Sequence, residues 1–412
     1  MTDPIRLLHF ADVHIGMENY GGIDRSTGIS SRVMDFIRRM NEIAEYAEEN
    51  DADLVIFAGD AFKTRTPDPT YVREFARRIK RLSDQCPVVV LVGNHDIPSM
   101  VQKASSVEIF HTLEVGGVIV GRTDALHTIE TKRGPVQVAT VPYPMRQRLL
   151  GELSTRGLSV GRVDELLRQQ VEILIRNLAE QVDPDIPAVL TGHFTVSGAR
   201  LGSEKDIMLG RDVAVMKSAL LDPVWDYVAL GHIHYHQDLN AGSYPPIVYS
   251  GSIERIDFGE EGAPKGFCWV ELARGGTRYE FVELNARPFQ TIRVDVRGEE
   301  DPTAAVVRAI GRHDLTDAVV RLIITATPEN EPKIRDREIV AALSDCAFVA
   351  AIQRDIDYPV RARLGVERPE GLSERELLER FLATKQIDPE RIELLAAYAE
   401  RLFAGEAGGP TD

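Results

Sequence analysis

Short apolar runs alternate with amphipathic segments through the first 285 residues of the chain. Apolar runs typical of buried strands lie at residues 5–11, 54–60, 88–96, 188–193, 226–232 and 247–252. Apolar residues at helical spacing predict helices over about 31–50, 70–83 and 162–182. Strands that alternate with helices in this way indicate an α/β layered fold.

A domain boundary near Pro288 separates residues 1–287 from a smaller domain, residues 288–365. The smaller domain contains three strand candidates and two helix candidates in the order βαβαβ, which predicts a small α+β unit. It carries no cluster of residues with recognisable chemistry. We therefore expect the catalytic residues, if there are any, to lie in the first domain.

Residues 366–404 predict a pair of helices. Ser373 and Glu376 form a capping box at the start of the first helix, and Pro389 starts the second. Apolar positions repeat at helical spacing in both segments, so we expect a helical hairpin. The final residues, 405–412, are expected to be disordered.

The composition is that of an ordinary globular protein, with 43% hydrophobic and 27% charged residues. No apolar run has the roughly 20 residues that a membrane span needs. The N-terminus lacks the basic and apolar regions of an export signal, so we expect a cytoplasmic protein. The cysteines Cys86, Cys268 and Cys346 are far apart, which predicts buried free thiols rather than a disulfide or zinc site.

The net charge of −16 argues against a protein that binds nucleic acid through its overall field. That mode of binding relies on lysine and arginine side chains that neutralise phosphates. A polyanion would have to be held locally in this chain. Bound divalent ions or a basic partner subunit could provide the positive charge.

Five polar motifs each follow an apolar strand candidate, where ligands bind in α/β sheets. They are DxH (Asp12, His14), GD (Asp60), GNHD (Asn94, His95), GH (His193) and GHxH (His232, His234). Residues two apart in an extended segment face the same way, so the DxH and GHxH pairs can each hold an ion. Imidazole, carboxylate and amide ligands suit manganese, iron or zinc better than calcium. This set is sufficient for two ions if one carboxylate bridges them.

The other histidines lack such settings, and we expect none of them to bind metal. His9 lies inside the first strand and is expected in the core, whereas His236 is expected on an exposed turn. His111, His127 and His313 are likewise not expected to bind metal. We expect Asp96, which ends the GNHD motif, to orient its loop rather than to bind an ion.

The set of motifs resembles the calcineurin-like metallophosphoesterase superfamily. The segments ADVHIG, GNHDIPSM, GHIHYHQ, YSGSIERIDFGEE and KGF resemble more closely the SbcD nuclease family and its meiotic-recombination relatives. The resemblance is close over residues 5–270 and looser over 288–360. It implies a four-layer metallophosphoesterase β-sandwich flanked by helices, followed by a small α+β cap domain and a C-terminal helical hairpin.

The resemblance implies a site for two divalent ions, most commonly manganese, with magnesium, iron and zinc as alternatives. The implied ligands of one ion are Asp12, His14, Asp60 and His234. Those of the other are Asp60, Asn94, His193 and His232, so that Asp60 bridges. His95 would stand over the phosphate and donate a proton to the leaving oxygen, stabilise developing charge, or only orient the substrate.

The family resemblance also implies DNA as the substrate, with 3′–5′ exonuclease action on double strands and endonuclease action on single strands during break or hairpin processing. It implies an SbcC-like ATPase partner that binds residues 373–403, and a homodimer. Some family members carry a histidine three residues after the GD aspartate that is linked to exonuclease action, but this chain has Lys63. Lys63, Arg65 and Arg255 are candidate DNA contacts, although a solvated loop explains them equally well.

Two other functions stay open. The same ligands serve small-molecule phosphodiesterases and phosphatases, but such enzymes have less evident use for a cap and a terminal helical hairpin. A non-catalytic scaffold should have lost ligands, and none is missing from this sequence. A nuclease is therefore the interpretation that uses every part of the chain.

Overall fold

The computed structural model describes residues 3–25, 27–98, 103–150, 158–202, 213–358, 372–385 and 387–403. Contacts divide the chain into two units. The first comprises Met1–Ile292, His313–Leu322 and Leu343–Ile352, and the second Arg293–Arg312, Ile323–Ala342 and Gln353–Asp412. Within the described ranges, no helix has the length and apolar character needed to cross a membrane.

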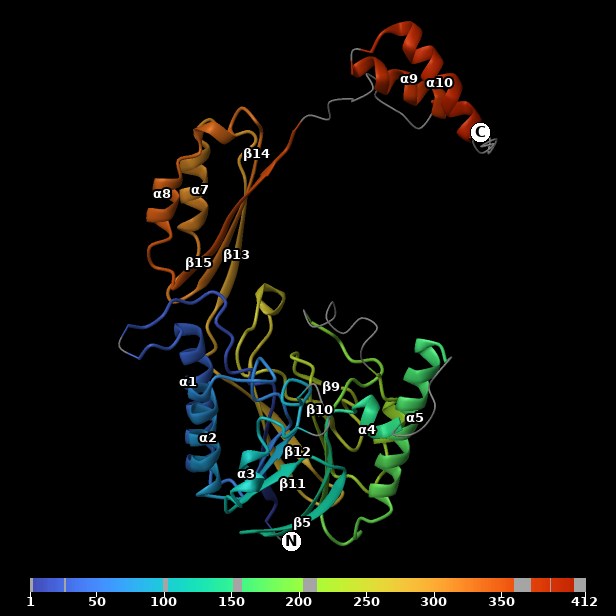
Figure 1. Cartoon of the computed structure of the whole chain (residues 1–412). Coiled ribbons are helices and arrows are strands. Elements are labelled where there is room, and N and C mark those ends of the chain that lie inside the picture. The colour runs from blue at the N-terminus through green and yellow to red at the C-terminus, as the bar shows by residue number, and fades with distance from the viewer. Residues whose placement is uncertain are drawn as a thin grey trace. The chain divides into compact units, whose positions relative to one another are not determined.

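Two six-stranded sheets build the centre of the first unit (Figure 1). One has the order β12-β11-β1-β2-β3-β4, with β1 Ile5–Phe10, β2 Leu54–Phe57, β3 Val88–Leu91, β4 Val118–Gly121, β11 Gly266–Leu272 and β12 Arg278–Glu283. The other has the order β5-β6-β7-β8-β10-β9, with β5 Ala125–Thr131, β6 Gly134–Val141, β7 Ala188–His193, β8 Tyr227–Gly231, β9 Gln237–Asp238 and β10 Ile247–Tyr249. Strand β2 pairs in parallel with β1 on one side and with β3 on the other. Strands β7 and β8 also pair in parallel.

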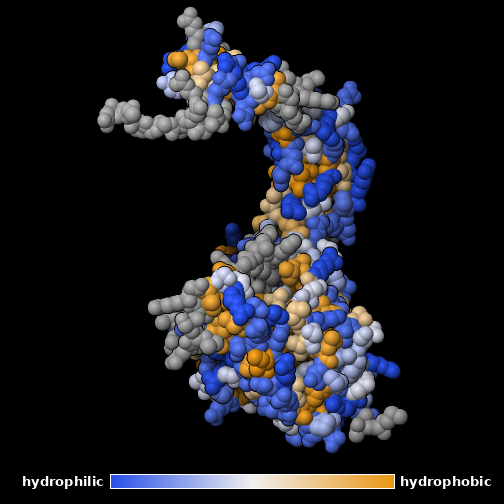
Figure 2. All heavy atoms as spheres, turned by 90° about the vertical axis from the view of Figure 1, so that its right-hand side faces the viewer, coloured by the Kyte–Doolittle hydropathy of each residue, from blue (hydrophilic) through white to orange (hydrophobic). Residues whose placement is uncertain are grey.

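Helices cover the outer faces of these two sheets, with α1 and α2 on one side and α4 and α5 on the other (Figure 1). The helical elements of the first unit are α1 Ser31–Glu49, α2 Pro69–Ser83, α3 Ile109–Thr112, α4 Arg146–Leu150, α5 Val160–Ala179, η1 Lys217–Leu220 and η2 Phe258–Glu260. On the side of α5, hydrophilic side chains surround small apolar groups at the surface (Figure 2). This is the outer face expected of an amphipathic helix.

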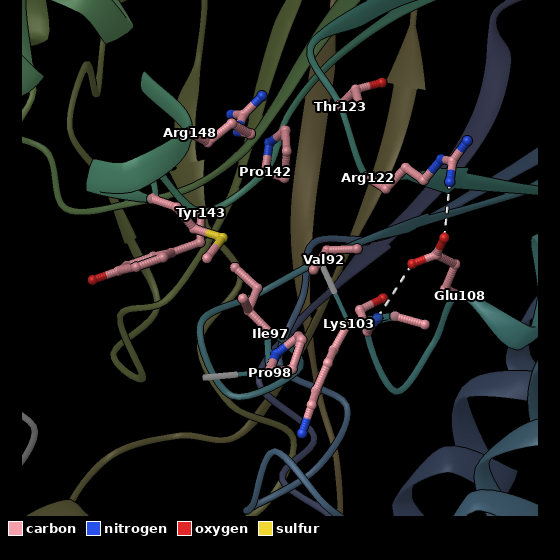
Figure 3. Close-up of a pocket in the computed structure, with 13 residues that line it drawn as sticks. Val92, Ile97, Pro98, Lys103, Glu108, Arg122, Thr123, Pro142, Tyr143 and Arg148 are labelled. Carbon is pink, nitrogen blue, oxygen red and sulfur yellow. Dashed lines mark hydrogen bonds and ion pairs between the residues drawn. The ribbon is translucent and has the colours of Figure 1, made fainter. Parts of the chain in front are cut away.

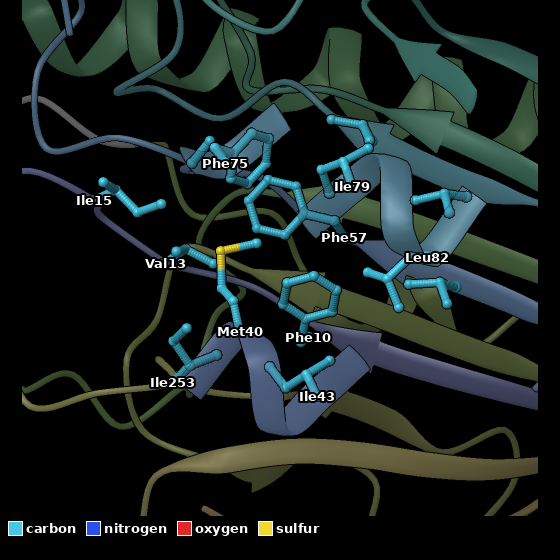
Figure 4. Packing of buried hydrophobic residues seen from close by; sticks show 14 of the residues in the cluster. Phe10, Val13, Ile15, Met40, Ile43, Phe57, Phe75, Ile79, Leu82 and Ile253 are labelled. Atoms are coloured by element: carbon cyan, nitrogen blue, oxygen red, sulfur yellow. The ribbon is translucent and has the colours of Figure 1, made fainter. Parts of the chain in front are cut away.

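Apolar cores lie between the successive layers. Leu7 and Ile56 of one sheet share a buried cluster with Val189 of the other, so the two sheets pack face to face. On the outer side of the first sheet, Phe10 and Phe57 pack with residues of α1 and α2 (Figure 4). A third cluster joins α5 to the second sheet. The order helix, sheet, sheet, helix confirms the predicted four-layer α/β sandwich.

The predicted helices and strands of the first 285 residues are confirmed, with ends that shift by a few residues. The start of α2 shows a local cause, because the Asp68 carboxylate accepts a hydrogen bond from Thr70 N at 2.7 Å and Pro69 occupies the first turn. Strands β4, β5, β6, β9, β11 and β12 were not predicted from the sequence. Strand β5 is mostly half-buried or exposed, so it has only a weak apolar pattern.

A third sheet has the order β13-β14-β15, with β13 Phe289–Asp295, β14 Val319–Ala326 and β15 Phe348–Ile356. The helical elements that follow Pro288 are α7 Pro302–Ile310, η3 Glu331–Lys333, α8 Asp336–Ala342, α9 Glu374–Thr384 and α10 Pro389–Phe403. The predicted order βαβαβ is confirmed, as is the capping box of Ser373 and Glu376. The expected boundary at residues 365/366 and the expected disordered tail, 405–412, lie outside the described residues.

Three side-chain expectations can be compared with the structure. Cys86 and Cys268 are buried free thiols as predicted, but Cys346 is only half-buried. His9 is a core residue as predicted, with Nδ1 3.1 Å from the Tyr227 hydroxyl, and burial lowers the pKa of His9 to about 3. The expectation of an exposed His236 is wrong. Its ring stacks on Phe281 at 4.2 Å, which removes part of it from water.

Candidate metal centre

The polar motifs of both sheets converge where their parallel strands end. Asp12 follows β1, Asp60 follows β2, and Asn94 and His95 follow β3. From the second sheet, His193 ends β7, and His232 and His234 follow β8. Since parallel strands end at the same edge of a sheet, the face-to-face packing brings these side chains together.

The backbone bends sharply at the motif residues. Asp12, His14, Asp60 and His232 have φ angles of 52°, 49°, 62° and 93°, in the left-handed region that residues with a side chain rarely adopt. Such conformations are concentrated at functional sites. At Gly59 the φ angle is 100°, and an added Cβ would lie 2.4 Å from His193 Nδ1, so only glycine fits beside this histidine.

The side chains form two groups of candidate metal ligands. One contains Asp12, His14 and His234, and the other contains Asp60, His193 and His232. Within each group the ligand atoms lie within 4.8 Å of one another. His14 and Asp60 also form a third group with His95, so the first two groups adjoin each other.

Asp60 and Asn94 link the imidazoles of the centre. Asp60 Oδ2 lies 3.7 Å from His14 Nε2 and 3.4 Å from His193 Nε2, between the two groups. Asn94 Oδ1 lies 3.0 Å from both His193 Nε2 and His232 Nδ1. The Asp60 carboxylate is thus within reach of both groups of candidate ligands.

Hydrogen bonds outside the centre fix the orientation of two histidine rings. His193 Nδ1 donates to the carbonyl of Ala58 at 2.7 Å, and His234 Nδ1 donates to Glu260 Oε1 at 2.7 Å. Each ring is thereby oriented with Nε2 toward the other ligands, and a metal ion can take the place of a proton at Nε2 while Nδ1 keeps its own. His234 Nε2 lies 3.1 Å from His14 Nε2.

Glu260 belongs to a buried ion pair that the sequence analysis did not identify. Its carboxylate lies 2.7 Å from Lys265 Nζ, and neither side chain is exposed. Lys265 also donates to Ser252 Oγ at 2.7 Å and to the His234 carbonyl at 3.2 Å. Burial raises the pKa of Glu260, but Lys265 and His234 outweigh it and hold that pKa well below its usual range. Glu260 and Lys265 lie in segments that carry the family resemblance, but their spacing gives no sign that they meet.

Two aspartates hold the loops of the centre in place. The carboxylate of Asp12 accepts the backbone N–H of His232 at 3.0 Å and so joins the two sheets. Asp96 accepts the backbone N–H groups of Asp60, Ala61 and Gly93 at 2.9, 3.0 and 3.0 Å. The expectation that Asp96 orients its loop is confirmed.

His95 lies at the edge of the centre and is half-buried. Its ring centroid is 4.9 Å from that of His14, and its backbone N–H donates to Asp60 Oδ1 at 2.8 Å. His95 Nδ1 donates to the carbonyl of Lys63 at 2.7 Å. The backbone of Lys63 therefore orients His95.

The three residues that are candidate DNA contacts differ in their exposure and in their hydrogen bonds. The side chain of Lys63 is half-buried, whereas Arg65 is exposed and lines a pocket together with Asn94. The guanidinium of Arg255 donates to the backbone carbonyls of Glu261, Ala263, Ala286 and Arg287. These hydrogen bonds give Arg255 a structural role that the sequence could not show, because they depend on segments that meet only in the fold.

The electrostatics of the centre favour bound cations. Burial lowers the pKa of His14 well below its ordinary value, so this imidazole is neutral and can ligate. Burial also lowers the pKa of His193, but the Asp60 carboxylate outweighs it and raises that pKa to about 9. A buried position that attracts a proton so strongly also suits a divalent cation, and the mixed nitrogen and oxygen donors fit manganese, iron or zinc.

The comparison with protein families decides the class of this site. Residues 5–236 match the calcineurin-like phosphoesterase family. The chain belongs to this family. It is accordingly a metal-dependent phosphoesterase, a hydrolase of phosphate esters.

Curated members of this family are similar to the chain at moderate identity. It is 29% identical over 281 residues to the SbcD subunit of the SbcCD nuclease of Bacillus subtilis (strain 168), covering 66% of this chain and 67% of the relative. The SbcD subunit of Escherichia coli (strain K12) is 26% identical over 418 residues, covering 98% of this chain and 99% of the relative. The DNA double-strand break repair protein Mre11 of Archaeoglobus fulgidus is 27% identical over 337 residues, covering 75% of this chain and 66% of the relative.

Proposed function

We propose that this chain is a two-metal DNA nuclease. The observation that carries the proposal is the position of Asp60 between two histidine-containing groups of ligands. The relatives that match most of the chain are named as nuclease and DNA-repair proteins, which makes DNA the substrate we propose. The mixed donor set leads us to propose manganese as the ion used.

We assign the ligands as the family resemblance implies. The proposed ligands of one ion are Asp12, His14, Asp60 and His234. Those of the other are Asp60, Asn94, His193 and His232. Bound ions supply Lewis acidity for the phosphodiester and lower the pKa of an attacking water.

The residues of the chain supply orientation and a proton. The hydrogen bond from His95 Nδ1 to the Lys63 carbonyl fixes the ring with Nε2 free for the substrate. In its imidazolium form the ring gives the Nε2 proton to the leaving oxygen and keeps the proton on Nδ1. Asp60 accepts the backbone N–H of His95, so the same carboxylate positions the acid and the ions. We include Lys63 and Arg65 among the proposed DNA contacts. We leave Arg255 out because backbone carbonyls engage its guanidinium.

The acidic net charge supports a second, basic subunit that grips DNA. We propose an SbcC-like ATPase for this role, bound through residues 373–403, and a homodimer of the chain itself. Such a complex would act on chromosomal DNA in the cytoplasm, at double-strand breaks or hairpins. The proposed domains are residues 1–287 for catalysis, 288–365 as a cap and 366–404 for partner docking.

The test is cleavage of end-labelled double-stranded and single-stranded DNA with manganese, magnesium or a chelator. We expect manganese-dependent cleavage that the chelator abolishes, and a rate about 10² to 10⁴-fold lower in His95→Asn, with bound manganese retained. The matched control is His111→Asn, which changes an exposed histidine and should cleave at the normal rate. Hydrolysis of bis(4-nitrophenyl) phosphate without DNA cleavage, even with the ATPase and ATP present, would instead support a small-molecule phosphodiesterase.

A further inference from the structure

A pocket of about 400 Å³ opens directly beside the candidate metal centre. Asn94, which lies 3.0 Å from His193 Nε2 and His232 Nδ1, forms part of its wall. Arg65 lines the same pocket from the loop after β2. A chemical group bound in this pocket would therefore lie next to a substrate phosphate bound at the metal centre, or be covalently attached to it.

Tyr143 stands between the pocket and the histidines. Its ring centroid lies 5.7 Å from that of His232 and 6.4 Å from that of His193. The backbone N–H of Tyr143 donates to the carbonyl of Val92 at 3.1 Å, which ties it to the end of strand β3. The ring is half-buried and lines the pocket, so part of it can contact a ligand.

The remaining wall is part apolar and part polar. Ile97, Leu167 and Val213 line the pocket, and each is at least nine-tenths buried. Polar groups lie among the lining residues, including Arg65 and Asp164. A flat aromatic group with polar edges fits a wall that combines an aromatic ring, apolar side chains and polar groups, and in a nucleic acid that group is the base.

A neighbouring pocket shares Tyr143 and Ile97 but offers a different chemistry (Figure 3). In that view the Tyr143 ring extends away from the ion pair of Arg122 and Glu108, which are 2.8 Å apart. Arg148 of the same pocket pairs with Asp124, also at 2.8 Å. Carboxylates thus neutralise both arginines, whereas Lys103, which also lines this pocket, is exposed. The pocket with Asn94 is the one that adjoins the proposed reaction.

We propose that the pocket lined by Asn94 and Tyr143 binds one unpaired nucleobase, next to the phosphate that is cleaved. The inference rests on the proposed nuclease function and adds a preference among DNA substrates. A base can enter the pocket only if it leaves the stack of a duplex, so the pocket favours single-stranded or unpaired positions. Stacking of one base on an aromatic side chain strengthens binding roughly 5- to 150-fold.

The test uses two kinds of single-stranded oligonucleotide, each with one cleavable phosphodiester. The first kind carries thymidine on both sides of that bond. The second kind carries an abasic tetrahydrofuran residue in place of the thymidine on one side or on the other. The kcat/KM with manganese is measured for the natural chain and for Tyr143→Ala, Tyr143→Phe and the control Tyr358→Ala, whose tyrosine is 66% exposed.

We expect the natural chain to cleave the thymidine substrate about tenfold better than the substrate that is abasic on one particular side of the bond. Tyr143→Phe and Tyr358→Ala should keep that preference. Tyr143→Ala should lose it. Equal cleavage of both substrates by the natural chain would overturn the base pocket and leave the nuclease intact. A tenfold preference that survives in Tyr143→Ala would do the same. Failure to cleave either oligonucleotide, with manganese bound, would overturn the nuclease function and the pocket together.

Discussion

His234 Nδ1 and Glu260 Oε1 lie 2.7 Å apart at the edge of the candidate metal centre. The buried ammonium of Lys265, 2.7 Å from the same carboxylate, keeps Glu260 ionised. The hydrogen bond fixes the tautomer and the direction of His234, and an ionised acceptor makes the imidazole a stronger ligand. Metal affinity should therefore depend on a residue that does not touch the metal.

Glu260→Gln is expected to weaken the binding of one manganese ion about 10- to 100-fold, because a neutral amide polarises His234 less. Manganese titration with the purified chain measures this. The double variant Glu260→Gln/Lys265→Met removes the unpaired buried charge and should recover stability but not affinity. Asp226→Asn is the control, since Asp226 is equally buried but precedes strand β8, at the end opposite His232. Unchanged affinity in Glu260→Gln would refute the proposed role.

Asp60→Asn removes the carboxylate that lies between the two ligand groups. We expect the chain to lose at least one of two bound manganese ions and DNA cleavage to fall about 10³-fold. Metal content by mass spectrometry, together with the cleavage rate, checks both expectations. Two ions retained at an unchanged rate would contradict a bridging role for Asp60.

Asp35 stabilises the first unit through a buried cluster of charges. Its carboxylate lies 2.7 Å from Arg32 and forms two hydrogen bonds, at 2.6 and 2.7 Å, with Arg287. Burial raises the pKa of Asp35, but Arg287 and Arg32 outweigh it and leave that pKa lowered. Asp35→Asn should reduce the free energy of unfolding by about 3 kcal/mol at neutral pH.

The pH dependence of this effect has a definite sign. Because the folded-state pKa of Asp35 is depressed, its stabilisation is present above the ordinary pKa of 3.8 and is lost as pH falls through the folded value. In urea unfolding, the difference between the natural chain and Asp35→Asn should shrink below about pH 4. Asp84→Asn, in an exposed pair with Lys80, should change stability by less than about 1 kcal/mol. A difference that grows on acidification would exclude this explanation.

The exposed apolar residues of α10 offer a test of partner docking. Leu394 is 61% exposed and Leu395 is 39% exposed. Leu394→Glu should weaken the pull-down of an SbcC-like ATPase at least about tenfold, because it places a charge in an apolar interface. Manganese-dependent DNA cleavage by the isolated chain should not change. Glu393→Gln, on the same helix, is the control, and full binding by Leu394→Glu would remove α10 from the proposed interface.

The layered fold and the residues of the candidate centre could both be predicted from the amino-acid sequence. Both follow from local patterns, because each ligand motif comes directly after an apolar strand and strand ends are readable from the chain. Asp12 and His14, or His232 and His234, are neighbours in sequence, so their proximity needs no knowledge of the fold. The capping box at Ser373 is local for the same reason.

The contacts through which distant segments support that centre became visible in the folded chain. Glu260 contacts His234 and Lys265, and the Tyr143 ring lies next to that of His232. Arg255 donates hydrogen bonds to backbone carbonyls up to 32 residues away in the sequence. No periodicity encodes such contacts, since they arise from the packing of two sheets and the course of the loops between them. The sequence thus predicted which residues form the candidate metal centre, whereas three-dimensional packing decided which residues orient them and which pocket adjoins the centre.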